Sequence, residues 1–408
     1  MDAAVLAVGD ELLLGDIVNS NAAWLGEHLA AVGARVVASA MVGDDVQRLA
    51  TALRRALEDA EVVVVTGGLG PTLDDLTRDA IALVADVPLE RSPALEDQLR
   101  ERFAAFGHPM PEAVLRQADV PRGARVLDNP VGTAPGLRVQ VGERIVYAVP
   151  GPPHEMRAVC AQVLPEVAAR SGEVLTTRTL HCAGIGESAV AERVEAAVRV
   201  PDGVQLAYLA GGGVVRVRFT GTDPGVLAPL VEASLAALGD AVWGRDGDTL
   251  PGVVHALLAA RSATVAVAES LTGGLVSAAL TQLPGSSAGF RGGLLTYATD
   301  TKASLAGVPD EVLAEHGAVS EEAARAMADG VRARLGATYG VALTGVAGPE
   351  EQDGRPVGTV HVAVAGPAGT RVRAARLPGD RERVRLLAVT LALDLLRRVL
   401  QAPDTPSA

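Results

Sequence analysis

The chain has 408 residues, a net charge of −13 and a hydrophobic content of 49%. A chain of this length exceeds one ordinary hydrophobic core, so we expect two or three domains, and the apolar content excludes an intrinsically disordered protein. The acidic balance argues against direct nucleic-acid binding, which depends on neutralising phosphates with Lys and Arg.

The apolar runs and the cysteines narrow the class of protein further. Runs such as residues 62–65 are far shorter than the ~20 residues of a membrane helix, and no basic and apolar leader precedes the first expected strand. We therefore expect a cytoplasmic protein with no membrane partner. Cys160 and Cys182 lack CxxC spacing, which predicts buried thiols rather than a disulfide framework or a thiolate zinc site.

The first part of the chain alternates apolar strands with amphipathic helices. Strands are predicted over residues 3–8, 35–42 and 61–66, with a helix capped by Ser20 and a helix over 46–60 between them. This alternation is typical of βαβ units and predicts a parallel sheet.

A glycine-rich loop, TGGLGPT over residues 66–72, follows the third predicted strand, and Asp74, Asp75 and Asp79 open the next helix. Glycines permit a ligand to approach the backbone, and a helix start favours an anion. The crevice at the carboxyl ends of parallel strands is where open α/β sheets bind ligands. The loop therefore indicates a phosphate or nucleotide site, with a plain tight turn as the alternative.

Two other polar segments support this interpretation. The three asparagines of the chain, Asn19, Asn21 and Asn129, all lie in turn-like segments of the same domain. A strand over 143–149 then runs into PGPPHEM, where prolines fix the backbone beside His154 and Glu155.

The last part of the chain, after a Gly/Asp linker over 243–250, is another α/β domain. A strand over 263–268 leads into ESLTGG at residues 269–274, and a strand over 340–344 leads into TGVAGP. The strands are expected to form a mixed sheet with helices on both faces. The segment between the two domains is expected to be a small α+β spacer.

Lys302 is the only lysine among 36 basic residues. Burial can lower the pKa of an ammonium group, whereas a guanidinium stays protonated, so among these 36 side chains a catalytic base has to be the lysine. Hydroxyls gather upstream of it, and a Ser–Lys pair can activate a weak nucleophile. A surviving surface lysine without a task is the alternative.

Several long motifs give the chain a resemblance to a known family. These motifs are GDELLLGDIVNSN, TGGLGPTLDDLTRDA, NPVGTAPG, VPGPPHEM, GIGES, AESLTGG, PGSSAGF, HGAVSEEAA and GVAGP with PVGTV. Along essentially its whole length the chain resembles the competence/damage-inducible protein family called CinA. The resemblance implies an α/β protein with an N-terminal molybdopterin-binding-like three-layer domain (residues 1–170), a small KH-like α+β domain (171–245) and a C-terminal α/β/α CinA amidohydrolase domain (249–402).

The resemblance also implies an activity. The C-terminal domain would convert nicotinamide mononucleotide (NMN) to nicotinate mononucleotide and ammonia, in pyridine-nucleotide salvage and without a cofactor. The N-terminal domain would hydrolyse ADP-ribose with a divalent metal ion, and the chain would form a homodimer. Two rivals stay open: a molybdopterin-processing enzyme, and a non-catalytic partner protein in competence or DNA repair.

Carried over to this sequence, the family pattern makes Ser287 the nucleophile and Lys302 its base. Ser270, Tyr297 and Thr344 would orient the amide and stabilise the oxyanion. The residues expected to hold the nucleotide are Thr272, Gly273, Gly274, Ser286 and Gly348, with Arg381 on its phosphate.

For the N-terminal domain, the resemblance and the glycine loop together predict a nucleotide site. Its expected residues are Gly9, Asp10, Glu11, Asn19, Asn21, Thr66, Gly67, Gly68, Gly70, Thr72, Asp74, Asp79, Pro152, His154 and Glu155. The resemblance places Asp44 and Asp75 nearest to the metal-bound pyrophosphate.

Overall fold

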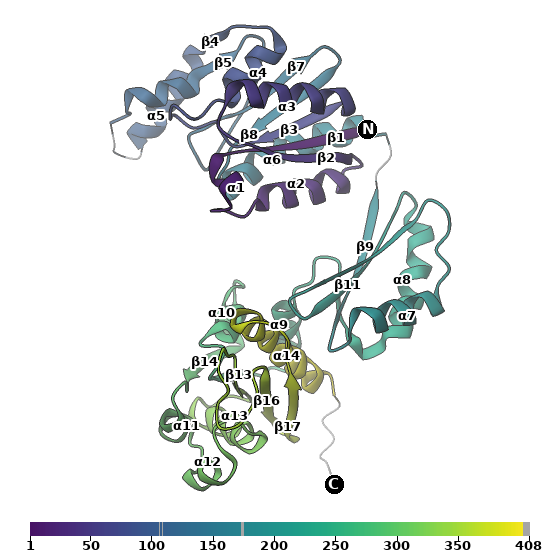
Figure 1. The fold of residues 1–408 in the computed structure, drawn as a ribbon, viewed down its shortest axis with the longest axis vertical. Coiled ribbons are helices and arrows are strands. Elements are labelled where there is room, and N and C mark those ends of the chain that lie inside the picture. Colours follow the sequence, from purple (N-terminus) through teal and green to yellow (C-terminus); the bar gives the residue numbers. More distant parts are fainter. Residues whose placement is uncertain (106, 108, 173–174, 403–408) are drawn as a thin grey trace. The chain divides into compact units, whose positions relative to one another are not determined.

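The computed structural model describes residues 1–105, 107, 109–172 and 175–402, and the chain divides into two compact units, Met1–Thr176 and Thr177–Ala408 (Figure 1). We describe each unit by itself. No helix in the described ranges is both long enough and apolar enough to cross a membrane.

The first unit is a three-layer α/β domain. Its elements are β1 (Asp2–Val8), α1 (Asp10–Leu14), α2 (Ser20–Ala31), β2 (Arg35–Val42), α3 (Val46–Asp59), β3 (Val62–Thr66), α4 (Thr77–Ala85), β4 (Leu89–Arg91), α5 (Pro93–Ala105), the 3-10 helix η1 (Glu112–Ala118), β5 (Asp119–Pro121), β6 (Arg125–Leu127), β7 (Gly136–Val141), β8 (Arg144–Val149) and α6 (Pro153–Arg170). The main sheet has the order β2-β1-β3-β8-β7-β6.

The predicted parallel pairing of the first three strands is confirmed, and β8 joins them in parallel. β7 and β6 extend the sheet with antiparallel pairing. Alternate residues of each strand face opposite sides, so Leu6 packs on the side of α3 and Val5 on the side of α2 and α6. The two apolar cores on the two faces make the three layers.

The second unit begins with a four-stranded sheet in the order β10-β11-β9-β12. Its elements are β9 (Thr176–Ala183), α7 (Glu187–Ala197), β10 (Gln205–Gly211), β11 (Val214–Gly221), α8 (Pro224–Leu238), the 3-10 helix η2 (Gly239–Ala241) and β12 (Val242–Arg245). Phe219, Leu180 and Val190 are among the fully buried side chains between this sheet and its two helices.

The rest of the second unit is a sheet in the order β14-β13-β15-β16-β17, covered on both faces. Its elements are α9 (Leu250–Ala260), β13 (Val265–Glu269), α10 (Leu275–Thr281), the 3-10 helix η3 (Ser286–Ala288), β14 (Phe290–Leu295), α11 (Thr299–Ala306), α12 (Asp310–His316), α13 (Glu321–Arg334), β15 (Tyr339–Gly345), β16 (Thr359–Gly366), β17 (Gly369–Arg376) and α14 (Arg381–Gln401). β13, β14 and β15 are parallel while β16 and β17 are antiparallel, so the predicted mixed sheet is confirmed.

A buried ionic cluster joins α14 to the four-stranded sheet within this unit. Asp394 and Arg397, each 1% exposed, pair at 2.6 Å, and Arg398 bonds the other carboxylate oxygen of Asp394 at 2.8 Å. Arg397 also donates to the Asp240 carbonyl of η2, and Arg398 donates to the Ala183 carbonyl of β9 at 3.4 Å. Because buried charges are costly unless paired and hydrogen-bonded, this cluster fixes the sheet against the helix.

Candidate active sites

Lys302, in the first turn of α11, is the centre of the C-terminal candidate site. Its side chain is only 2% exposed. The Nζ donates to the Thr296 carbonyl at 2.8 Å, to the Tyr297 carbonyl at 3.4 Å and to the Ser270 Oγ at 3.2 Å. Ser270 follows β13 and Thr296 follows β14, and these parallel strands end at the same edge of the sheet.

Burial lowers the pKa of Lys302 from its usual 10.5 to about 8, although the Asp353 carboxylate opposes the shift. A neutral amine keeps two N–H donors and gains a lone pair. Two carbonyls and one hydroxyl surround the Nζ, so the neutral form can satisfy both carbonyls and accept the Ser270 proton. The arrangement suits a general base acting on Ser270.

Ser287 does not lie beside Lys302 within one chain. It belongs to η3, which precedes β14, and the Val265 N–H bonds the Gly289 carbonyl at the start of β13. Val265 and Glu269 are at opposite ends of β13, about 13 Å apart at ~3.3 Å per residue. Ser287 therefore lies near the opposite ends of the strands from Ser270. The predicted Ser287–Lys302 pair is therefore corrected to Ser270–Lys302 in the single chain.

Arg381, Tyr297 and Gly348 are brought together as expected for parts of one site. The Arg381 guanidinium donates to the Tyr297 hydroxyl at 2.7 Å and to the Gly348 carbonyl at 2.5 Å. Arg381 starts α14, and Asp380 caps that helix by accepting from the Arg383 N–H. The contact places a permanent cation at the carboxyl ends of the strands. Tyr297 lies there because it follows β14, the strand that ends beside Lys302.

Glu269 is a site residue that the sequence analysis missed. It is completely buried, and its carboxylate accepts from the N–H groups of Gly274, Val276 and Ser277 and from the Ser277 hydroxyl. These bonds satisfy the free donors at the start of α10. Glu269 thus holds the loop that carries Ser270. The sequence signal that could have indicated this role is its position directly before SLTGG.

The glycines of that loop adopt backbone conformations that other residues rarely take. Gly273 and Gly274 have φ values of 59° and 99°. Thr272 is fully buried and its hydroxyl has no hydrogen-bond partner in the described structure. Arg385 of α14 donates to the Thr272 carbonyl at 3.0 Å, which ties the loop to the helix that begins with Arg381. Ser286 lies in η3, away from this loop.

Thr344 lies beside Ser270 on the next strand, because Glu269 is paired with Leu343 and the Ser270 N–H bonds the Leu343 carbonyl. The Thr344 hydroxyl donates to the Ala318 carbonyl at 2.7 Å, and Thr344 is paired with His361 on β16. Neither ring nitrogen of His361 has a hydrogen-bond partner in the part of the chain described. His361 was not predicted, and a lone histidine in a strand carries little signal.

The first unit has a cavity of about 530 Å³ at the carboxyl ends of β1, β3 and β8, a size typical of small-ligand sites. The predicted residues that line it are Glu11, Asn19, Asn21, Thr66, Gly67, Gly68, Gly70, Asp75, Pro152 and Glu155. The predicted residues that are not part of its lining are Gly9, Asp10, Asp44, Thr72, Asp74, Asp79 and His154.

Asn21 connects three walls of the cavity. Its Nδ2 donates to the Thr66 hydroxyl at 2.9 Å and to the Gly151 carbonyl at 2.7 Å, and the Thr66 hydroxyl donates to the Pro150 carbonyl. Asn19 caps α2 by accepting from the Ala22 N–H. The polar residues after β1 thus bind those after β3 and β8, which is the proximity expected for parallel strands.

Asp75 has a structural task in the glycine loop. Its two carboxylate oxygens accept from the Gly70 N–H at 2.7 Å and from the Thr72 N–H at 2.8 Å. Arg78, buried beneath the loop, donates to the carbonyls of Leu69 and Gly70. Both Asp75 oxygens already accept bonds that close the loop, so a metal ion held by Asp75 would share these oxygens with the N–H donors.

Asp44 lies in an acidic group beside α1. Asp44 and Asp10 accept from each other's backbone N–H groups at 3.0 and 3.1 Å. Burial raises the pKa of Asp44, as do the neighbouring charges of Asp10, Glu11 and Asp74. In the described ranges no three His, Cys, Asp or Glu residues form a group able to hold a metal on their own.

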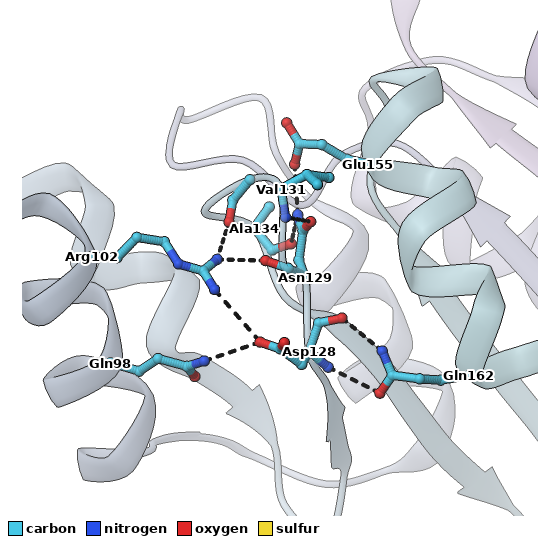
Figure 2. A network of polar contacts seen from close by, with 9 residues as sticks. Gln98, Arg102, Asp128, Asn129, Val131, Ala134, Glu155 and Gln162 are labelled. Atoms are coloured by element: carbon cyan, nitrogen blue, oxygen red, sulfur yellow. Dashed lines mark hydrogen bonds and ion pairs between the residues drawn. The ribbon is translucent and has the colours of Figure 1, made fainter. Parts of the chain in front are cut away.

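Figure 2 shows how the NPVGTAPG segment is fixed at the cavity wall. The Asn129 side chain donates to the Glu155 carboxylate at 2.7 Å and to the Ala134 carbonyl at 2.8 Å. Arg102 donates to the Asn129 carbonyl at 2.6 Å. Glu155 therefore anchors a loop as well as lining the cavity.

Several cavity residues were not predicted from the sequence. Gln117, from η1, is 1% exposed and lines the cavity, as do the apolar Ile17 and Val18. The 3-10 helix that carries Gln117 is far along the chain from the glycine loop, and no sequence pattern connects the two.

The fold and these sites define a multidomain α/β protein with a ligand cavity in its first unit and a buried Ser–Lys pair in its second. Family models match all three parts: the probable molybdopterin binding domain over residues 4–169, the damage-inducible protein CinA KH domain over 177–244 and the CinA C-terminal domain over 248–400. The chain belongs to the CinA family.

Two relatives span nearly the whole chain, and one solved structure matches part of it. A CinA-like protein of Frankia casuarinae is 53% identical over 98% of this chain and 96% of its own. A putative competence-damage inducible protein of Symbiobacterium thermophilum is 44% identical over 98% of this chain and 99% of its own. A solved structure of the protein CinA of Thermoplasma acidophilum, described as of unknown function, is 36% identical, covers 41% of this chain and 97% of that one, and has a TM-score of 0.39.

Proposed function

We propose that the C-terminal part of this protein hydrolyses the amide of a small nucleotide, with NMN as substrate, through Ser270 and Lys302. The observation that carries the proposal is the 3.2 Å contact between the Lys302 Nζ and the Ser270 Oγ in a buried site. A buried lysine with a lowered pKa beside a serine is a recognised way of activating a weak nucleophile. The choice of NMN rests on the family resemblance.

The chemistry starts with neutral Lys302. It takes the proton of Ser270 as the Oγ attacks the amide carbon, and the ammonium then gives this proton to the departing nitrogen, so the C–N bond breaks and ammonia leaves. Water attacks the resulting ester, Lys302 takes a proton from the water, and that proton returns to Ser270. The products are the carboxylate and free enzyme, and no cofactor takes part.

Substrate binding is assigned to the carboxyl ends of the strands around the reacting serine, Ser270. The Arg381 guanidinium is suited to bind the phosphate, since arginine recognises phosphate through two parallel hydrogen bonds. Its bond to the Tyr297 hydroxyl orients it. The Ser270–Gly274 loop supplies backbone and the buried Thr272 hydroxyl to the nucleotide.

The decisive measurement is ammonia release from NMN by the purified full-length protein, compared with the Ser270→Ala and Ser287→Ala variants. The proposal expects activity in the parent, none in Ser270→Ala and near-normal activity in Ser287→Ala. Absence of ammonia release in the parent would favour the two rivals, a pterin-processing enzyme or a non-catalytic partner protein.

A second function, nucleotide pyrophosphate hydrolysis with ADP-ribose as substrate, is favoured for the first unit by its 530 Å³ cavity beside the glycine loop. A divalent cation would supply charge neutralisation for the pyrophosphate, and Mg²⁺ is commonly held by one or two carboxylates together with substrate phosphates. Of the predicted pair, Asp75 lines the cavity, whereas Asp44 lies in an acidic group and is not part of the cavity lining. The test is formation of AMP and ribose 5-phosphate with and without Mg²⁺.

A further inference from the structure

Gln117 carries a buried amide that has no partner in the first unit. Its side chain is 1% exposed and lines the cavity, and neither its Oε1 nor its Nε2 has a hydrogen bond within the part of the chain that the structure describes. Buried polar side chains are nearly always hydrogen-bonded, because an unpaired donor or acceptor costs free energy. An exception that lies in a cavity indicates that a ligand supplies the missing partners.

The other two side-chain amides of the cavity lining already serve the protein. The Asn19 Oδ1 accepts from the Ala22 N–H and caps α2. The Asn21 Nδ2 donates to the Gly151 carbonyl and so connects two walls of the cavity. The side chain of Gln117 makes no bond of this kind, so both ends of its amide are available to a ligand.

The main chain around Gln117 is fixed beside the glycine loop. The Arg116 guanidinium donates to the Thr72 carbonyl at 2.6 Å, and Val114 and Ala118 of the same 3-10 helix are buried in the core. A buried side chain on such a segment is already ordered before a ligand binds, which lowers the entropic cost of binding. The unpaired amide is therefore a fixed feature of the cavity wall.

The cavity combines this amide with apolar walls. Ile17, Val18 and Leu69 line it together with the glycine loop. A planar heterocycle suits such a place, because its faces are largely apolar and its edge is polar. An amide offers a donor beside an acceptor, which matches an edge with an acceptor beside a donor, as adenine has at N7 and its amino group.

We propose that Gln117 binds the base of the nucleotide in the first-unit cavity, donating to a ring nitrogen of adenine and accepting from its amino group. This inference rests on the nucleotide pyrophosphatase function proposed above and adds the residue that selects the base. A nucleotide whose base lacks the amino group leaves the buried Gln117 oxygen unpaired in the complex, so it binds more weakly.

Calorimetric titration of the full-length protein with three probes tests this role, with Mg²⁺ present throughout. AMP carries the complete edge, purine riboside 5′-monophosphate lacks only the amino group, and ribose 5-phosphate lacks the base. Gln117→Met removes the amide at similar volume and should weaken AMP binding about 10- to 100-fold. It should weaken binding of purine riboside 5′-monophosphate much less and leave ribose 5-phosphate binding unchanged, because the lost contact is made to the base.

Gln47→Met, on the exposed face of α3, is the matched control and should leave all three affinities unchanged. The ligand-free Gln117→Met protein should unfold at a temperature no lower than that of the parent, because the substitution removes an unpaired buried amide. Thermal unfolding followed by circular dichroism measures this, and it separates a lost contact from a lost fold.

Several results would overturn the role of Gln117 while the pyrophosphatase proposal stands. These are an unchanged AMP affinity in Gln117→Met, or equal losses for AMP and ribose 5-phosphate in that variant. The parent protein gives a further test that needs no variant, since equal affinities for AMP and purine riboside 5′-monophosphate would also contradict the role. If the parent binds none of the three probes, both proposals fail together.

Discussion

The Lys302 Nζ and the Ser270 Oγ lie 3.2 Å apart, at the ends of two segments that are 32 residues apart in the chain. The pair is buried, and the two carbonyls that share the Nζ fix its direction. This geometry suits a base that acts on Ser270.

The first prediction concerns the nature of this base. Lys302→Arg keeps the positive charge but supplies no accessible lone pair, so kcat for NMN deamidation should fall by about 10²–10⁴-fold with little change in KM. Steady-state ammonia release measures both constants. A phosphate-binding lysine would give the opposite result, a changed KM with near-normal kcat.

The second prediction separates the two candidate serines. Ser270→Ala should abolish deamidation, whereas Ser287→Ala should leave kcat close to that of the parent. The reason is that η3 lies at the opposite ends of the strands from Ser270. The two substitutions remove the same hydroxyl, so each is the control for the other. Loss of activity in Ser287→Ala alone, with both variants folded, would restore Ser287 as the nucleophile.

The third prediction is a pH dependence. Since Lys302 has a pKa of about 8 in the folded protein, kcat/KM should rise with pH through 8 as the neutral amine forms. The unfolded chain binds more protons than the folded chain between about pH 8 and 10.5, so the contribution of Lys302 to the free energy of unfolding increases with pH in that window. Lys302→Met should accordingly be more stable than the parent at pH 7, and this gain should vanish above pH 10.5. Thermal unfolding at several pH values measures this, and an equal gain at all pH values would contradict it.

The fourth prediction concerns Asp75. Asp75→Ala removes the acceptor that closes the glycine loop, so ADP-ribose hydrolysis should be lost while NMN deamidation persists. Asp59→Ala, at the exposed end of α3, is the control for a lost surface charge. If Asp75→Ala abolished both activities in a folded protein, the two sites would not be separate.

The fifth prediction concerns the ionic cluster of α14. Asp394→Ala leaves Arg397 buried without its carboxylate, which commonly costs about 3–5 kcal/mol. The unfolding transition of the second unit should move to lower temperature, while Glu315→Ala, a side chain 77% exposed, should leave it unchanged. Differential scanning calorimetry measures both, and an unchanged transition in Asp394→Ala would show that the cluster does not hold the helix.

The sequence by itself determined the order of strands and helices in the first 66 residues and the strands that lead into the glycine-rich loops, because apolar periodicity depends on residues close in the chain. It did not predict β4 to β7, α5 or β10. The sequence also singled out Lys302, because it is the only lysine of the chain. It singled out the glycine loop at 66–72 as well, because that loop lies between a predicted strand and a predicted helix. These features are local, and the structure retains them.

The tertiary structure decided which groups meet. A parallel crossover returns the chain to the starting edge of the sheet, so Ser287, which precedes β14, lies far from Ser270, which follows β13, although only 17 residues separate them. Likewise the carboxylate of Asp75 was free to be a metal ligand in the sequence, and it closes a loop in the fold. Hydrogen-bond partners depend on strand direction and loop closure, and no single segment of sequence contains that information.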